Sequence, residues 1–443
     1  MISRADLNEG QVAALDALLA WARDEGGPRL LSLSGPAGTG KTTLLHLFAE
    51  EADTATWSAM TGRAARRMRD VGLKGARTAH SALYHRPREV DNRRDRRIEL
   101  EFDKVRKDDP GLLVIDEASM IDRRFLAHVG QSIYEKILLV GDPVQIPPVN
   151  GQDKNGGEDW SVFGAVPGPC LTEVMRTSGA IVETATRVRE RQEIIHETLE
   201  HGGSRYDYTT DFRGALRDWF DDRDDHVLIT WRNEVRMNLN RQIRQILGRS
   251  SPLPEVGEPV VIRKNDHKKE IMNGDILFVD GWEGDGPIVA GIATRYVRIR
   301  SRQHPPIPTA APEDIDPWAD DGSRVILTAL EGRDHGPFDG SLPYVGLDAW
   351  NRGLVDAGLA RWEGRDLIVE EPVIPLSYGY VLTGHLCMGS EYRRATTLIL
   401  NDLMSRNFRK PTTLPDGTKM PFAIRYIYTC LTRAKERSIM VVT

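Results

Sequence analysis

Short apolar runs alternate with helix-spaced apolar positions along the first third of the chain. Val12, Leu15, Leu18 and Leu19 recur at helical spacing and predict a helix over residues 6–23. Uninterrupted apolar stretches predict buried strands at 112–115 and 137–140, the apolar run at 30–33 predicts a further strand, and 55–62 predicts a strand and turn. Strands of this kind, separated by helices, are typical of a parallel sheet with helices on both faces, so the predicted fold class is α/β.

The second half of the chain changes character twice. A strand at 226–231, a helix at 235–247 and a last apolar run at 438–442 continue the α/β pattern. Between them, 260–266 and 272–279 alternate apolar and polar residues and include Asn273-Gly274, a dipeptide that favours a tight hairpin turn. We therefore expect an insertion of short β-strands.

Length and composition narrow the class of protein. With 443 residues, 40% hydrophobic and 28% charged, the chain is expected to form two or three globular domains. It has neither a signal-peptide pattern nor an apolar run long enough to span a membrane, so a cytoplasmic protein is expected. Three widely spaced cysteines indicate neither a disulfide framework nor a Cys-rich zinc site.

A phosphate-binding loop follows the first predicted strand. Its pattern is GxxxxGK[ST], and glycines there let successive backbone N–H groups point inward at the start of the next helix. Lys41 is expected to reach the outer phosphates and Thr42 to complete a Mg²⁺ shell. A chance glycine-rich turn is the alternative, and the strand–turn–helix setting disfavours it. The predicted loop consists of Gly35, Pro36, Ala37, Gly38, Thr39, Gly40, Lys41, Thr42 and Thr43.

Two later strands also end in polar residues. Asp116 and Glu117 follow the strand at 112–115, where Asp116 can hold Mg²⁺ and Glu117 can polarise a water in line with the γ-phosphate. Gln145 follows the strand at 137–140 and can orient the same water. Parallel strands end at one edge of a sheet, so these groups are expected beside the phosphate loop.

Charge is unevenly distributed. Residues 61–107 hold 15 Lys or Arg against 7 Asp or Glu, within a chain of net charge −6. Such a local excess is expected where nucleic-acid phosphates dock, although a solvated basic face is the alternative for 86–107. Residues 308–339 carry 8 acidic against 2 basic residues, so a solvated loop or partner-binding surface is expected there.

Together these stretches resemble the motifs of superfamily-one helicases, most closely the branch with the RecD-like and Dda-like enzymes. Gly35–Thr43 is similar to motif I, Asp116–Ser119 to motif II and Gly141–Pro148 to motif III. The stretch 59–65 resembles motif Ia, with Met60 where the family usually has proline.

The resemblance continues downstream. Residues 171–176 are similar to motif IV, 383–392 to motif V and 428–435 to motif VI. In motif V, Leu386 and Met388 replace a lysine and a glutamine that help the family couple DNA contact to the ATP site.

The resemblance implies roles for single residues, with ATP and Mg²⁺ as cofactors. Gln11, in Leu7-Asn8-Glu9-Gly10-Gln11, would read the adenine, as its amide could by itself. Arg176 and Arg433 would reach the γ-phosphate from the second motor domain when the two halves close. The implied nucleic-acid contacts are Thr61, Arg63, Thr78, His80, Thr383 and His385.

The implied fold is two RecA-like P-loop NTPase domains with a small β-hairpin insertion and an SH3-like β-barrel insertion. The first motor domain would span 1–175 and the second 176–250 with 376–443, leaving 251–375 as the SH3-like insertion with an acidic, loop-rich extension. The segment 86–107 would form a hairpin that acts as a wedge at the fork, because strand separation must break base stacking of roughly 1.4 kcal/mol per step.

The function expected from these features is an ATP-dependent DNA helicase that moves along single-stranded DNA, 5′ to 3′ by resemblance, in replication, recombination or repair. Its partners would be single-stranded and forked duplex DNA and a single-strand-binding or replication protein, without a membrane. Two alternatives stay open: an RNA helicase of the same superfamily, and a nucleic-acid remodelling or loading factor that uses ATP only as a switch.

Overall fold

A computed structural model of the chain describes most of its residues. Side chains are described for 3–52, 55–84, 111–147, 160–174, 179–223, 225–266, 268–269, 271–300, 324–330, 338–339, 341–364 and 367–443, and for 88–92, 97–101, Ser323 and Asp366 only the backbone is described. The chain divides into two compact units, the first formed by 1–86, 103–232 and 382–443, the second by 87–102 and 233–381.

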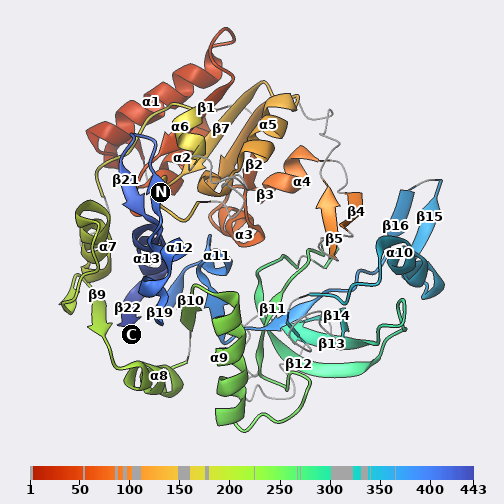
Figure 1. The fold of residues 1–443 in the computed structure, drawn as a ribbon. Helices are drawn as coiled ribbons and strands as arrows, with labels where there is room; N and C mark the ends of the chain where they lie inside the picture. Colours follow the sequence, from red (N-terminus) through yellow and green to blue (C-terminus); the bar gives the residue numbers. More distant parts are fainter. Residues whose placement is uncertain are drawn as a thin grey trace, which may run out of the picture. The chain divides into compact units, whose positions relative to one another are not determined.

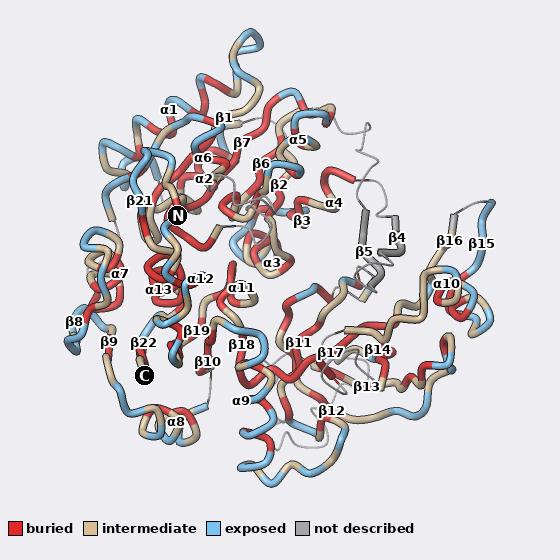
Figure 2. The backbone as a smooth tube through the Cα atoms, in the orientation of Figure 1, coloured by how far each residue is buried: buried red, intermediate tan, exposed pale blue. Residues whose placement is uncertain are grey.

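The first unit contains a parallel sheet of order β1-β7-β6-β2-β3 (Figure 1). Uninterrupted apolar runs place its central strands in the core, and Figure 2 shows β6 and β7 as buried. Its strands are β1 (Leu30–Ser34), β2 (Ala55–Ala59), β3 (Arg77–Thr78), β6 (Leu112–Asp116) and β7 (Lys136–Gly141). Its helices are α1 (Glu9–Arg23), α2 (Lys41–Glu51), α3 (Gly62–Asp70), α4 (Ala79–Leu83), α5 (Arg123–Gln131) and α6 (Val162–Ala165), with 3₁₀ turns η1 (Arg4–Asp6) and η2 (Ala118–Met120).

A second sheet of order β18-β10-β19-β22-β9-β8 belongs to the same unit except for Val381. Strands β10, β19, β22 and β9 are parallel, while β8 is antiparallel to β9. The strands are β8 (Leu199–His201), β9 (Ser204–Thr209), β10 (His226–Thr230), β18 (Val381–Thr383), β19 (Tyr392–Ile399) and β22 (Ala434–Val442), with a separate pair β20 (Pro411–Thr413) and β21 (Lys419–Pro421). The helices are α7 (Ala180–Arg191), α8 (Phe212–Asp221), α11 (Gly384–Cys387), α12 (Arg406–Arg409) and α13 (Phe422–Leu431), with η4 (Asp402–Met404).

The second unit is built on an antiparallel sheet of order β14-β13-β12-β11-β17. Its core is apolar, centred on Val279, Val297 and Ile299. The elements are α9 (Asn233–Ile246), β11 (Pro259–Ile262), β12 (Ile276–Asp285), β13 (Thr294–Arg300), β14 (Ser323–Ala329), α10 (Leu347–Asp356), β15 (Ala360–Glu363), β16 (Asp366–Val369) and β17 (Leu376–Tyr378).

Of the two predicted insertions, the structure contains the hairpin but does not confirm the SH3-like barrel. An antiparallel hairpin is present as β4 (Arg88–Asn92) and β5 (Arg97–Glu101), as the sequence predicted. Strands β11 and β12 pair antiparallel as the sequence predicted, but the predicted turn is misplaced. Asp266 and Ile271 bridge within their connection, so Asn273-Gly274, where Gly274 has φ 94°, is a turn on the second arm and not the turn that joins the strands. The strand order of the described residues does not confirm an SH3-like barrel. The predicted domain boundaries stay predictions.

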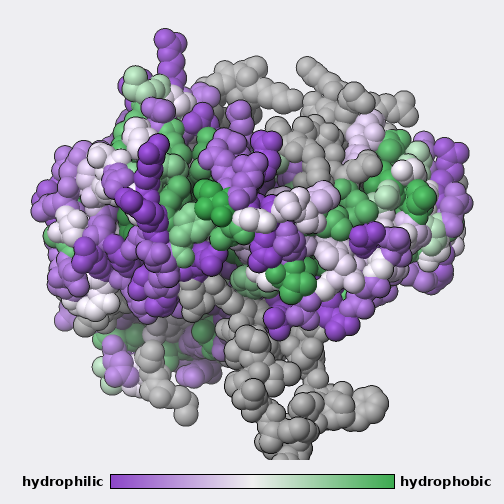
Figure 3. All heavy atoms as spheres, turned by 90° about the horizontal axis from the view of Figure 1, so that it is seen from below, coloured by the Kyte–Doolittle hydropathy of each residue, from purple (hydrophilic) through white to green (hydrophobic). Residues whose placement is uncertain are grey.

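None of the described helices has the length and apolar character needed to cross a bilayer. Figure 3 shows one face on which hydrophilic side chains predominate and hydrophobic ones form small groups.

Candidate nucleotide site

The phosphate loop leaves β1 and enters α2 through two residues in the left-handed region. Gly38 has φ 84° and Gly40 has φ 83°, which side chains other than glycine adopt at a cost. A Cβ on Gly40 would lie 2.3 Å from Nε2 of Gln11, so this position also lacks the space for one. The loop therefore takes the predicted strand–turn–helix form, with α2 beginning at Lys41.

Lys41 lies folded back onto the loop. Its Nζ donates hydrogen bonds to the carbonyl oxygens of Gly35, at 2.6 Å, and Pro36, at 2.8 Å. The Thr39 hydroxyl donates to the same Pro36 carbonyl at 2.9 Å. The loop thus holds an ammonium group at its mouth, where a phosphate would exchange for the carbonyl contacts.

Gln11 contacts the loop from α1. Its Nε2 donates to the Thr39 carbonyl at 2.9 Å, and its Oε1 accepts from the backbone N–H of Asn8 at 3.1 Å. Asn8 caps α1 by accepting from the Gln11 N–H, so the two residues form a capping box. With 3% exposure, Gln11 has both ends of its amide engaged by the backbone. The adenine-reading role stays a prediction.

Asp116 and Glu117 lie at the end of β6. Asp116 Oδ1 accepts from the Glu117 N–H at 2.8 Å, and Glu117 takes a left-handed φ of 56°. Burial raises the pKa of both carboxyls, and the charge of Asp116 raises the pKa of Glu117 further. Lys41 opposes the rise in both, and Arg433 opposes it in Glu117, so these four groups share one electrostatic site.

The donor set fits Mg²⁺ better than a metal that needs a full protein cage. The described residues contain no cluster of three or more His, Cys, Asp or Glu that could hold a metal ion. Asp116 and Thr42 offer hard oxygen donors, and Mg²⁺ usually takes one or two protein ligands with phosphate oxygens and water.

Gln145 and Asp142 lie in the loop after β7. Asp142 is fully buried, and its Oδ1 accepts from the Val144 N–H at 2.9 Å. Gln145 is 5% exposed, and no described atom hydrogen-bonds its Oε1. A buried, unsatisfied amide oxygen is costly, so this group has an acceptor ready for a water or ligand proton.

Helix α13 reaches this loop from the second sheet. Arg425 donates to the backbone carbonyls of Pro143, at 2.9 Å, and Gln145, at 2.7 Å. The Tyr428 hydroxyl donates to Asp142 Oδ2 at 2.6 Å and accepts from the Ala37 N–H in the phosphate loop at 2.9 Å. Thr429 Oγ1 accepts from the Ile146 N–H at 3.0 Å. We call this set, Arg425, Tyr428 and Thr429 with their partners, the α13 contact.

Arg433 follows α13 and is 5% exposed. Its guanidinium donates to the carbonyls of Thr429, at 3.1 Å, and Ser390, at 3.3 Å, and its charge lowers the pKa of Glu117. It therefore lies within electrostatic reach of the carboxylates of the first sheet. The other predicted arginine, Arg176, lies outside the described residues.

A second contact joins α3 to the segment after α11. Arg63 Nη1 donates to the Tyr392 hydroxyl at 2.8 Å and its Cζ lies 5.4 Å from the ring centroid. Arg67 pairs with Glu391 at 2.7 Å. Burial raises the pKa of Tyr392 to about 12, although the Arg63 charge opposes the rise. We call this set the α3 contact; in it Arg63 contacts the second sheet.

The remaining predicted nucleic-acid residues shape local backbone. Thr61 caps α3 by accepting from the Ala64 N–H at 3.1 Å, and Thr78 caps α4 by accepting from the Ser81 N–H at 3.3 Å. Thr383 is the residue before α11. Their roles toward a strand stay predictions.

Two predicted histidines are half-buried. Burial lowers the pKa of His80 to about 4, against a smaller opposing effect of Asp122, and the ring packs 4.9 Å from Phe125. Burial also lowers the pKa of His385. Both rings are therefore neutral at pH 7, and any contact they make with a strand is without charge.

A cavity of about 40 Å³ lies between the phosphate loop and the helices of the second sheet. Helix α7 supplies Ala185 and Arg189, and α13 supplies Tyr428. The phosphate loop thus faces space lined by both parts of the first unit.

Sequence reasoning missed Asp142, Arg425, Tyr428 and Tyr392. Tyr428, Tyr392 and Asp142 stand inside stretches that the sequence singled out for other residues. Polar residues adjacent to the chosen motif positions were therefore the available signal. Arg425 lies outside these stretches, and no signal in the sequence pointed to it.

Comparison with known proteins agrees with this fold. Residues 6–203 match the family model described as an AAA domain. No curated protein matches the sequence. A solved Pif1 helicase from Bacteroides, in complex with ADP-AlF3 and ssDNA, is similar over 99% of this chain and 92% of that chain, with 17% identity and a TM-score of 0.50.

Two further solved structures are similar. Bacteroides Pif1 bound to ssDNA has 16% identity and a TM-score of 0.49, covering 99% of this chain and 92% of that chain. Pif1 helicase from Candida albicans has 15% identity and a TM-score of 0.47, covering 99% and 94%. At 17% identity the first of the three similarities establishes the architecture alone: the chain has two RecA-like sheets in the fold of the Bacteroides Pif1 helicase, with residues 6–203 matching an AAA domain.

Proposed function

We propose that the protein is an ATP-dependent DNA helicase that moves along single-stranded DNA, with the 5′ to 3′ direction that its resemblance implies. The observation that carries the proposal is the α13 contact together with Arg433. One helix of the second sheet bonds to the phosphate loop through Tyr428, and the arginine after it acts on Glu117. A nucleotide bound at this loop would therefore alter the junction of two sheets, which is what a motor needs.

In this proposal the residues of the first sheet bind and hydrolyse ATP. The backbone of Gly35–Thr43 cradles the phosphates and Lys41 leaves its loop carbonyls for the outer phosphate oxygens. Glu117 polarises the attacking water, and Gln145 orients it through its unsatisfied Oε1. Thr42 and Asp116 would hold Mg²⁺, which neutralises charge that develops on the phosphates.

In this proposal the part of the first unit with the second sheet supplies positive charge to the bound ATP when the two sheets close on it. Arg433 is proposed as an arginine finger, with Arg176 as a second one from the segment before α7. DNA is the proposed substrate because the similar Bacteroides protein was solved with single-stranded DNA. Backbone contacts would dominate, so binding should be salt-sensitive and weakly sequence-specific.

Unwinding of forked substrates tests the whole proposal. Forks with a 5′ or a 3′ tail, in DNA or RNA, are compared for wild type, Lys41→Ala and Lys419→Ala, an exposed lysine of the same unit that lies outside the basic stretch 61–107. Lys41→Ala should lower ATP hydrolysis by about 10²–10³-fold and abolish unwinding, since one transition-state contact is lost. Lys419→Ala should match wild type. Unwinding by Lys41→Ala, or without a tail, would contradict the proposal.

The β4–β5 hairpin is proposed as the wedge that splits the duplex. Deleting 88–103 should leave ATP hydrolysis stimulated by single-stranded DNA largely intact while abolishing fork opening. Loss of both activities together would count against a wedge. Retention of both would show that another element separates the strands.

A further inference from the structure

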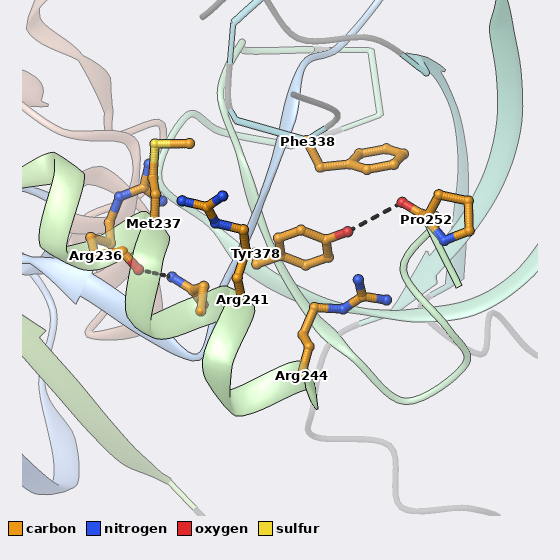
Figure 4. A pocket seen from close by; sticks show the side chains of 8 residues that line it. Arg236, Met237, Arg241, Arg244, Pro252, Phe338 and Tyr378 are labelled. Carbon is orange, nitrogen blue, oxygen red and sulfur yellow. Dashed lines mark hydrogen bonds between the residues drawn. The ribbon is translucent and has the colours of Figure 1, made fainter. Parts of the chain in front are cut away.

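The second unit contains a cavity of about 160 Å³ beside α9 (Figure 4). Five of its eight lining residues come from that helix, spaced so that their side chains share one face. As a result three guanidinium groups converge on one cavity. The lining residues are Arg236, Met237, Asn240, Arg241, Arg244, Pro252, Phe338 and Tyr378.

Arg244 is already neutralised. It binds Glu258 through two hydrogen bonds of 2.8 and 3.0 Å, and its Cζ lies 4.4 Å from the centroid of the Tyr378 ring. Glu258 is fully buried and has no other guanidinium partner among the described residues. Arg244 therefore builds the wall of the cavity and leaves no charge for a ligand.

Arg236 is buried without a carboxylate bonded to it in the described part of the chain. It is 3% exposed, and it donates from Nε to Asn233 Oδ1 at 2.8 Å and from Nη1 to Ser377 Oγ at 3.3 Å. Both acceptors are neutral. Burial lowers the pKa of Arg236 to about 10, and the charge of Arg263 lowers it further.

Arg263, which is half-buried, adds a second cation whose charge acts on Arg236. No described atom accepts a hydrogen bond from its buried Nη1. Asp339, 9% exposed, is the one carboxylate among the described residues whose charge acts on both arginines. Two guanidinium groups thus share one carboxylate in a site with little water, where an additional anion would be stabilised.

Arg241 supplies an accessible cation at the same cavity. Its side chain is exposed, and within the described ranges no acidic group pairs with it. In Figure 4 its guanidinium lies beside Tyr378, on the side of the cavity that also holds Met237. Among the described residues, the four guanidinium groups of Arg236, Arg241, Arg244 and Arg263 have two carboxylates acting on them, Glu258 and Asp339, so two positive charges exceed the described negative ones.

We propose that this cavity binds a phosphate-sized oxyanion between Arg236 and Arg241. The volume of about 160 Å³ is that of about five water molecules at ~30 Å³ each, which is ample for one tetrahedral anion. Planar guanidinium groups bind phosphate oxygens through paired hydrogen bonds. Phe338 and Tyr378 are 4% and 9% exposed, so no ring face is open for a base, and the phosphate is the group that the cavity recognises.

The phosphate has two sources that share this chemistry. It is either a phosphodiester of a bound single strand or a free phosphate anion. The strand source rests on the proposed function, whereas the anion site itself does not. The experiment therefore has one arm for the anion and one for the strand.

The anion arm uses inorganic phosphate and thermal unfolding at constant ionic strength, with chloride as the reference. All proteins carry Lys41→Ala, which removes the response of the phosphate loop. Arg241→Gln should weaken the apparent affinity for phosphate by about tenfold or more, the loss expected for one charge-assisted hydrogen bond. The matched control is Arg352→Gln, an exposed arginine on α10 of the same unit, which should respond as the parent does.

Arg236→Met provides a second variant, because methionine fills much of the same space without the charge. It should also lose the phosphate response. Equal responses in Arg241→Gln and Arg352→Gln, or a full response in Arg236→Met, would overturn the proposal.

The strand arm measures binding of a dT oligonucleotide to proteins with Lys41 intact, as a function of salt. If the anion is a phosphodiester, Arg241→Gln should reduce the slope of log K against log salt by about 0.7 while Arg352→Gln leaves it unchanged. An unchanged slope with a lost phosphate response assigns the free anion. Failure of the parent protein to bind dT would defeat the proposed function and leave the oxyanion site standing.

Discussion

Two contacts join the two sheets of the first unit, and they are made of different interactions. The α13 contact is buried, with Arg425, Tyr428 and Thr429 at 3%, 2% and 0% exposure, and most of its bonds end on backbone groups. The α3 contact holds an ion pair in which the Arg67 side chain is 41% and the Glu391 side chain 17% exposed.

This difference in burial makes the α13 contact costly to open and the ion pair of the α3 contact easy to open. Opening the α13 contact leaves carbonyls and a carboxylate without partners, and each unsatisfied buried group costs about 1–3 kcal/mol. Opening the α3 ion pair exposes two charges to water and costs about 0–1 kcal/mol. We therefore expect nucleotide binding to act on the α13 contact, where a phosphate can replace lost bonds, while the Arg67–Glu391 ion pair of the α3 contact opens and closes with little resistance.

The largest effect is expected from Arg425→Ala. Its guanidinium satisfies the carbonyls of Pro143 and Gln145, and it also donates to Thr412 Oγ1 at 3.3 Å. Removing it should lower the free energy of unfolding of the first unit by about 3 kcal/mol. Urea denaturation measures the loss, and Arg406→Ala, an exposed arginine on α12, serves as control. A loss below that of the control would show that the loop carbonyls find other donors.

A smaller effect is expected from Tyr428→Phe, which should lower the free energy of unfolding by about 2 kcal/mol. Without the hydroxyl, the Asp142 carboxylate loses a hydrogen bond and the Ala37 N–H loses its acceptor. The matched control is Tyr426→Phe. Its hydroxyl is equally buried but has no hydrogen-bond partner among the described residues, so its removal should be neutral or stabilising. Tyr428→Phe should also change the KM for ATP, since the bond to Ala37 holds the phosphate loop. If Tyr428→Phe and Tyr426→Phe had the same stability and the same KM for ATP, the Tyr428 hydroxyl would not contribute to the α13 contact.

These two tyrosines also show how much of the site can be predicted from the sequence. Runs such as 112–115 and 137–140 predict β6 and β7 because a strand buried on both faces must be apolar throughout. Lys41, Asp116 and Glu117 were predicted because their spacing and neighbours constrain them. The stretch 428–435 that resembles motif VI includes Tyr428 and excludes Tyr426, but nothing in the sequence assigns Tyr428 its contact, because one partner of its hydroxyl is a backbone N–H 391 residues away.

The second unit was less predictable for a related reason. The alternating residues at 260–266 and 272–279 predicted one strand pair, with its turn misplaced at Asn273-Gly274, but β13, β14 and α10 lie in segments without a clear pattern, and an SH3-like barrel is not confirmed. Its arginine cavity combines residues 236–244 with 338 and 378, so only the fold brings them together.

The smallest effect is expected at the α3 contact, from Arg67→Ala and Glu391→Ala measured singly and together. The coupling free energy of the pair should be about 0.5 kcal/mol and should fall as salt is raised, because the charges are partly exposed. Glu391→Ala alone should cost slightly more than Arg67→Ala, since Glu391 also lies 3.4 Å from Lys435. In contrast, the loss caused by Arg425→Ala should not depend on salt. A salt-independent coupling of about 2 kcal/mol at Arg67 and Glu391 would make the two contacts equivalent, and the division into a rigid and an adjustable contact would have to be abandoned.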